Sequence, residues 1–96
     1  MDEQRISAYL SGIAHELELR AYDSATIHAT AGVGKADNQG YDAFMPLIDS
    51  GISLYVWSKQ KFFASLLFTC KTFNDEDAVA FTKKYFEATD IEFMRF

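Results

Sequence analysis

The residues best able to do chemistry lie near the middle of the chain. Asp49-Ser50-Gly51 interrupts two apolar runs, and Cys70 is the one cysteine. A serine hydroxyl and a cysteine thiol can act as nucleophiles or proton carriers. Each also has an ordinary interpretation, because Asp-Ser-Gly is a common turn sequence and a lone cysteine in an apolar strand usually fills the core. Whether they can act together depends on the elements that position them.

The sequence contains the pattern of a β-hairpin that ends at these residues. Residues 52–57 (ISLYVW) alternate like a strand with one apolar face, and residues 62–69 (FFASLLFT) are apolar on both faces. The polar tetrapeptide between them, SKQK, indicates a four-residue loop, so Trp57 pairs with Phe62. Directly opposed residues share a face of the sheet. The register therefore places Asp49, Tyr55, Trp57 and Cys70 on one face, with the Asp-Ser-Gly turn beside the cysteine.

The remaining pattern indicates a small α+β domain. The predicted elements, in order, are a helix over 3–18, strands over 25–30, 41–48, 52–57 and 62–69, a helix over 74–88 and a last strand over 91–96. Asn74 is predicted to cap the second helix, and residues 31–40 form a loop. Pro46 favours an edge position or a bulge, and the two apolar faces of 62–69 favour a central strand. We therefore expect one domain over residues 1–96, an antiparallel β-sheet with two helices packed on one face.

Composition narrows the class of protein. The chain has 96 residues, 16% of them aromatic, with 9 basic against 14 acidic residues and a net charge of −5. The basic residues are scattered, which disfavours nucleic-acid binding, and no apolar run is long enough to span a membrane. The start MDEQRIS lacks the pattern of a secretory signal, and one cysteine forms no intrachain disulfide, so we expect a cytoplasmic protein. Cys70, His15 and His28 lack the spacing of zinc ligands, so we predict no metal site.

Residues 40–86 carry a resemblance to a known family. In the small prokaryotic S-adenosylmethionine decarboxylases, an apolar strand ends in Glu-Ser-His, and an alternating strand then ends in His-Thr-Trp. A hydrophobic strand ending in cysteine follows, and after it an acidic stretch and a helix. Here the same succession runs through Asp49-Ser50-Gly51, Ile52 to Trp57, Phe62 to Cys70 and then Asn74 to Phe86. The separations from the serine to the tryptophan and to the cysteine match without a gap, so the chain resembles this family.

The resemblance implies pyruvoyl chemistry in polyamine (spermidine) biosynthesis. In the family, the serine hydroxyl attacks the preceding carbonyl, and cleavage leaves a pyruvoyl group on the new N-terminus, which accepts the electrons released as carbon dioxide leaves. Position 50 supplies that serine here, and Cys70 matches the cysteine that returns a proton to the substrate carbon. Trp57 matches an aromatic residue beside the substrate, while Asp49 and Tyr55 occupy processing positions. The implied partners are S-adenosylmethionine or a related small amine, and a second copy in a homodimer.

The chain also departs from the family pattern, and these departures leave alternatives open. The histidines found directly after the serine and five residues after it are Gly51 and Tyr55 here, and a processing serine aligns with Asp42. A phenol with a pKa near 10 is a poor base at neutral pH. One alternative is a non-catalytic relative that binds S-adenosylmethionine or a polyamine, or that regulates an active decarboxylase. The other is a structural domain in which Asp-Ser-Gly is only a turn.

Overall fold

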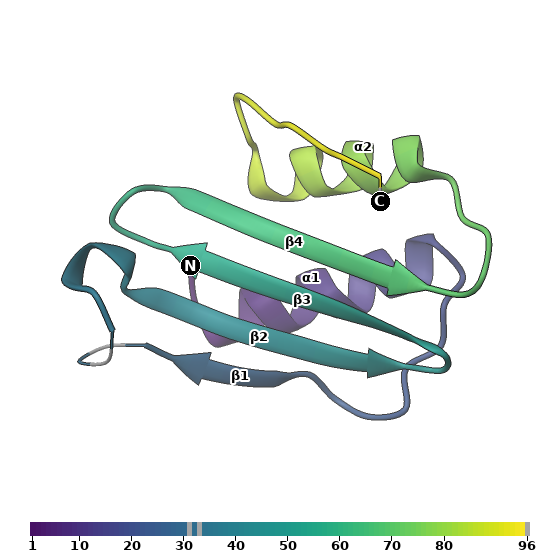
Figure 1. Cartoon of the computed structure of the whole chain (residues 1–96), viewed down its shortest axis with the longest axis horizontal. Coiled ribbons are helices and arrows are strands. Elements are labelled where there is room, and N and C mark those ends of the chain that lie inside the picture. Colours follow the sequence, from purple (N-terminus) through teal and green to yellow (C-terminus); the bar gives the residue numbers. More distant parts are fainter. Residues whose placement is uncertain (31, 33, 96) are drawn as a thin grey trace.

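The computed structural model describes residues 1–30, 32 and 34–95 and consists of two layers (Figure 1). One layer is a four-stranded antiparallel sheet with the strand order β1-β2-β3-β4. The other contains two helices on one side of the sheet. The elements are α1 (Glu3–Glu16), β1 (Thr26–Ala29), a short 3-10 helix η1 (Ala36–Asn38), β2 (Gly40–Leu47), β3 (Ser50–Trp57), β4 (Phe62–Thr69) and α2 (Asp75–Phe86). The α+β class expected from the sequence is confirmed.

Both helices begin at residues whose side chains can accept from free backbone amides. Asp2 caps α1 by accepting from the backbone N–H of Arg5 at 2.8 Å, and Asn74 caps α2 by accepting from that of Asp77 at 3.1 Å. Such caps satisfy amide donors that have no partner inside the helix. The predicted cap at Asn74 is therefore confirmed, and both helices lie within their predicted ranges.

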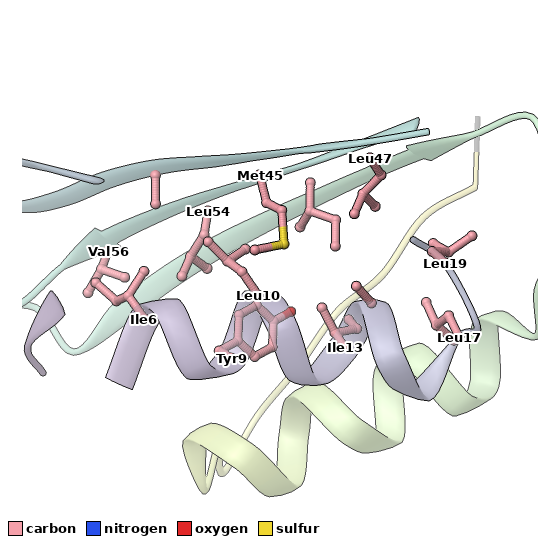
Figure 2. Close-up of a cluster of buried hydrophobic side chains, with 13 residues drawn as sticks. Ile6, Tyr9, Leu10, Ile13, Leu17, Leu19, Met45, Leu47, Leu54 and Val56 are labelled. Carbon is pink, nitrogen blue, oxygen red and sulfur yellow. The ribbon is translucent and has the colours of Figure 1, made fainter. Parts of the chain in front are cut away.

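The core lies between α1 and the inner face of the sheet (Figure 2). Apolar side chains at helical spacing on α1 meet alternate residues of β2 and β3, and the fully buried set includes Ile6, Tyr9, Leu10, Ile52 and Leu54. This pairing of a 3.6-residue period with a two-residue period is what allows one helix to cover one sheet face.

A buried phenol connects three elements inside this core. The hydroxyl of Tyr9 on α1 lies 2.9 Å from the Thr82 Oγ1 of α2 and 3.1 Å from the Ser65 Oγ of β4. Burial raises the pKa of Tyr9, and the two hydrogen bonds oppose this shift only in part. On the same side of the molecule, the rings of Phe86 on α2 and Phe63 on β4 lie 4.5 Å apart. These contacts hold α2 against both α1 and the sheet.

The hairpin register predicted from the SKQK loop is confirmed. Trp57 pairs with Phe62, and the ladder continues in the same register to Ser50 opposite Thr69. Beyond the ladder, the backbone N–H of Cys70 donates to the Asp49 carbonyl at 3.4 Å. The Asp-Ser-Gly segment and the cysteine are therefore neighbours.

Three expectations about the strands need correction. β4 is an edge strand rather than a central one, and its second apolar face points away from the helices. Residues 91–95 form no strand, and Arg95 instead pairs with Asp75 at the start of α2, with 2.5 Å between its Nε and the Asp75 Oδ2; residue 96 lies outside the described residues. β2 is an inner strand despite Pro46. The short β1 begins at Thr26, opposite Phe44, and does not reach Pro46, so the missing N–H of the proline removes no bond to β1.

The outer side of the sheet has no covering layer, and Figure 1 is viewed onto it with α1 behind the strands. We call this surface the open face. The register and the alternation of buried side chains assign to it the outward residues of the four strands: Thr26, His28, Gly40, Asp42, Phe44, Pro46, Gly51, Ser53, Tyr55, Trp57, Phe62, Ala64, Leu66 and Phe68.

No helix formed by the described residues is long and apolar enough to cross a membrane.

Candidate functional site

The turn between β2 and β3 positions Asp49 and Ser50. β2 ends at Leu47, which pairs with Ser50, so Ile48 and Asp49 alone connect the two strands. Asp49 has a φ of 57°, in the left-handed region that few residues other than glycine, asparagine and aspartate adopt readily. The peptide bond between Asp49 and Ser50 therefore lies at the sharpest point of a tight turn, with the serine already in a strand.

A neighbouring threonine orients the Ser50 hydroxyl. Ser50 Oγ donates to Thr69 Oγ1 at 2.7 Å, and the backbone N–H of Lys71 donates to the same oxygen at 3.0 Å. The hydrogen bond to Thr69 therefore fixes the direction of the Ser50 hydroxyl. An oriented hydroxyl next to a carbonyl carbon is the arrangement that intramolecular attack requires.

The carbonyl of Asp49, which precedes Ser50, accepts a hydrogen bond from across the hairpin. The donor is the backbone N–H of Cys70, with 3.4 Å between its nitrogen and the carbonyl oxygen. Backbone amides aimed at a carbonyl oxygen stabilise the negative charge that develops there during nucleophilic attack. The distance is long for such a bond, but catalytic hydrogen bonds often tighten only in the reacting state.

A cavity of about 300 Å³ opens at this turn. Its walls come from the segment after α1, the β2–β3 turn and the end of β4, and the lining residues are Glu18, Leu19, Arg20, Ile48, Asp49, Ser50, Cys70 and Lys71. The volume lies at the lower end of the range of about 300–1,000 Å³ that is typical of small-molecule sites. Cys70 is a free and exposed thiol on this wall.

Charges of both signs surround the cavity. Arg20 and Lys71 are cationic and Glu18 and Asp49 are anionic. The Lys71 ammonium donates to the backbone carbonyl of Glu18 at 2.8 Å, which connects the segment after β4 to the segment after α1. A ligand with both an amino and a carboxyl group would find a partner of opposite charge for each. Among the described residues, no group of three or more His, Cys, Asp or Glu side chains could hold a metal ion.

Two of the predicted site residues lie elsewhere. Tyr55 is 41% exposed on the open face. It lies five residues along β3 from Ser50, about 16 Å at the rise of a strand. Trp57 lies at the far end of the same strand, where its ring packs on Phe62 with 5.2 Å between centroids. The structure thus brings Asp49, Ser50 and Cys70 together but does not bring Tyr55 or Trp57 to the same cavity.

Sequence reasoning missed four residues of the cavity region: Glu18, Arg20, Thr69 and Lys71. Thr69 could have been found, because the confirmed register pairs it directly with Ser50. Arg20 and Glu18 follow the end of α1, and no local pattern links that segment to the turn. Their position depends on long-range contacts such as the backbone N–H of Ile48 donating to the Arg20 carbonyl at 2.9 Å.

Comparison with known proteins agrees with this geometry. A family model described as S-adenosylmethionine decarboxylase matches residues 1–96, the whole of the chain. No curated protein and no solved structure shows a significant match. The match covers both helices and all four strands, and it includes the turn, the hydroxyl and the thiol described above. The chain therefore belongs to the S-adenosylmethionine decarboxylase family.

Proposed function

We propose that the chain is a pyruvoyl-dependent decarboxylase of polyamine biosynthesis that forms its own prosthetic group by cleavage between Asp49 and Ser50. The observation that carries this proposal is the meeting of three groups at one turn. They are the oriented hydroxyl of Ser50, the hydrogen-bonded carbonyl of Asp49 and the thiol of Cys70. These are the groups needed to open a peptide bond at a serine and then to return a proton to a substrate carbon.

Six residues at or beside the cavity have definite roles in this proposal. Thr69 holds the Ser50 hydroxyl, and the Cys70 amide polarises the Asp49 carbonyl before cleavage. A pyruvoyl group derived from Ser50 would supply a carbonyl that accepts electrons as carbon dioxide leaves. The Cys70 thiol then lies on the cavity wall as the proton donor. Arg20 and Lys71 offer positive charge to the carboxylate of an amino-acid substrate, S-adenosylmethionine or a related amine.

The proposal includes a homodimer joined through the open face. The face spans about 26 by 19 Å at ordinary strand rise and spacing, so two copies would bury on the order of 1,000 Å², the lower bound for a specific interface. Tyr55 and Trp57 project from this face and cannot reach the cavity of their own chain. They could therefore contribute only to the cavity of a second copy. Pairing would also cover the exposed apolar residues of β4.

Intact-mass spectrometry under denaturing conditions tests the cleavage. The expected result is two fragments, residues 1–49 and residues 50–96, the second carrying a pyruvoyl group at its N-terminus. Ser50→Ala is the matched control and stays at the full mass of 10.9 kDa. Thr69→Val keeps the shape of the side chain but removes the acceptor, so it should slow cleavage by about 10- to 100-fold if one oriented hydrogen bond is lost from the transition state.

A second variant distinguishes two reasons for an uncleaved wild type: the lack of a basic side chain near Ser50, or a turn that cannot cleave itself at all. Gly51→His with Tyr55→His restores both family histidines and should promote cleavage: the histidine at position 51 is next to Ser50 in its own chain, whereas the one at position 55, about 16 Å away, could act only through a second copy. A side chain at position 51 would start 2.9 Å from the Phe44 ring, and that ring is 46% exposed and free to turn aside. If wild type and this double variant both stay intact, self-processing is refuted. The non-catalytic alternative then leads, and titration calorimetry with S-adenosylmethionine and with spermidine measures whether the cavity binds either.

A further inference from the structure

Three segments from distant parts of the chain meet around the cavity, at one end of the sheet (Figure 1). They are the segment after α1 (residues 18–20), the β2–β3 turn with the first residue of β3 (residues 48–50) and the segment after β4 (residues 70–71). These eight residues line the cavity. The positions of the three segments relative to one another therefore determine the shape of the site.

Two backbone hydrogen bonds attach the turn to both of its neighbours. The Ile48 N–H donates to the Arg20 carbonyl, in the segment after α1, at 2.9 Å. The Cys70 N–H, in the segment after β4, donates to the Asp49 carbonyl at 3.4 Å. Bonds of this type usually measure about 2.7–3.2 Å, so the second is the longer and weaker of the two. It is also the one that bears on chemistry, because the Asp49 carbonyl is the group that Ser50 would attack.

The side chain of Lys71 joins these two neighbours of the turn to each other. Its ammonium donates to the Glu18 carbonyl at 2.8 Å, which closes a ring of three hydrogen bonds around the cavity. Its backbone N–H donates at 3.0 Å to Thr69 Oγ1, the oxygen that also accepts from the Ser50 hydroxyl. Of the three bonds in the ring, the bond from Lys71 is the one that a side-chain substitution removes. An ammonium has three donors, so two remain for the carboxylate of a substrate.

We infer that Lys71 is a positioning residue, whose bond to Glu18 holds the Cys70 amide on the Asp49 carbonyl. In the proposed cleavage, the Ser50 oxygen forms a bond to the Asp49 carbonyl carbon, and the π electrons of the C=O bond move onto the carbonyl oxygen. The hydroxyl proton goes to the Ser50 nitrogen as the C–N bond breaks, which leaves an ester and a free amine. A backbone N–H directed at the carbonyl oxygen stabilises its developing charge. Without the Lys71 bond, the segment after β4 can move away from the turn and lengthen a contact that is already long.

Amide hydrogen exchange, measured by NMR, tests the ring directly. The inference rests on the proposed function for its effect on cleavage, so exchange is measured in a Ser50→Ala background that stays uncut. Lys71→Met removes the ammonium and keeps most of the stem. The Cys70 amide should then exchange about 2- to 10-fold faster, the factor that one net hydrogen bond represents, and its proton resonance should move upfield. The Thr30 amide, which donates to the Gly40 carbonyl at 3.0 Å, is the internal control and should not change.

The rate of cleavage tests the positioning. Intact mass is followed with time in chains made by cell-free synthesis. Lys71→Met should slow cleavage about tenfold, less than the roughly 10²- to 10³-fold that complete loss of such a donor causes. Lys71→Arg keeps a donor for the Glu18 carbonyl and should recover most of the rate. Lys59→Met is the matched control, because it removes a lysine bond of 3.0 Å to Asp37 outside the ring. Both lysines are exposed, so none of these variants should shift the midpoint of urea unfolding.

The remaining outcomes separate this inference from the proposed function. An unchanged Cys70 amide in Lys71→Met overturns the ring. Faster exchange with an unchanged rate of cleavage overturns the positioning role. Equal slowing in Lys71→Met and Lys71→Arg, or a lower urea midpoint in Lys71→Met, overturns it too, because Lys71 would then act only on the fold. If wild type itself stays uncut, the proposed function fails, and amide exchange alone decides whether Lys71 holds the Cys70 amide on the Asp49 carbonyl.

Discussion

Replacing Tyr9 by phenylalanine removes one oxygen atom from the centre of the fold. The Tyr9 side chain is fully buried, and its hydroxyl joins α1 to β4 through Ser65 and to α2 through Thr82. The ring itself packs against Phe86 with 4.6 Å between centroids, and this contact survives the substitution. Tyr9→Phe therefore tests the polar connection without creating a large cavity.

The expected loss follows from the surroundings of the two partners. A typical net contribution is about 0.5–1.5 kcal/mol for each hydrogen bond, and a buried group left without a partner costs about 1–3 kcal/mol. Ser65 is solvent-accessible and can bond to water instead, so its half of the loss is small. Thr82 is only 6% exposed and carries most of the cost. We expect Tyr9→Phe to lower the free energy of unfolding by about 1–2 kcal/mol.

The pH dependence of this variant has a definite sign. Burial raises the pKa of Tyr9 above its ordinary value of 10.0, so the folded state holds the phenolic proton more tightly than the unfolded state does. The contribution of this tighter proton binding to the free energy of unfolding is complete below pH 10. It is lost as the pH rises above 10 toward the pKa of Tyr9 in the folded state. In that window the difference in unfolding free energy between wild type and Tyr9→Phe should shrink, at a rate of at most about 1.4 kcal/mol per pH unit.

Urea denaturation followed by circular dichroism measures the differences in the free energy of unfolding. Thr82→Val and the variant with both substitutions complete a double-mutant cycle with wild type and Tyr9→Phe. The double variant should be more stable than the sum of the single losses predicts, because neither buried partner is left alone. Equal stability of Tyr9→Phe and wild type at pH 7 would refute the assignment of stability to this network. A constant difference from pH 8 to pH 11 would refute the link to the Tyr9 proton.

Two further predictions concern backbone packing and the thiol. Gly40→Ala would place its Cβ 1.9 Å from the Val56 carbonyl oxygen, so β2 and β3 must separate there. We expect a loss of about 1–3 kcal/mol in urea denaturation, and an unchanged midpoint would show that the strands yield freely. Cys70→Ala removes an exposed thiol and should change stability by less than about 0.5 kcal/mol while abolishing any carbon dioxide release. A large loss of stability would show instead that Cys70 is a structural residue.

The hairpin between β3 and β4 could be predicted because its pattern is local. A polar SKQK loop between two apolar runs sets the pairing of Trp57 with Phe62, and every later pair follows by counting. That count was sufficient to bring Cys70 beside the Asp-Ser-Gly turn. The helix caps are likewise properties of a few adjacent residues.

The sequence predictions that were wrong have a common physical cause. Whether a residue is buried depends on which other parts of the fold cover it, and a local sequence pattern does not contain that information. β4 is apolar on both faces, and the sequence alone does not distinguish a central strand from an edge strand whose outer face lacks a cover. The pattern IEFMRF alternates like a strand, but residues 91–95 pair with no strand of the described fold. Tyr55 and Trp57 share a face with the turn by parity, yet distance along β3 separates them from the cavity.

The position of the Asp49–Ser50 bond determines what a cleaved molecule would be. Residues 1–49 would retain α1, β1 and β2, and residues 50–96 would retain β3, β4 and α2. Neither piece holds a whole core, because the apolar side of α1 packs against strands from both. The two pieces would stay together through the β2–β3 ladder and this shared core. Unfolding would then release two molecules that must meet by diffusion to refold, so the stability of the cleaved protein would depend on its concentration. An uncut chain would refold as a single molecule, whereas cleavage would turn the domain into a complex of two pieces that must find each other again after dissociation.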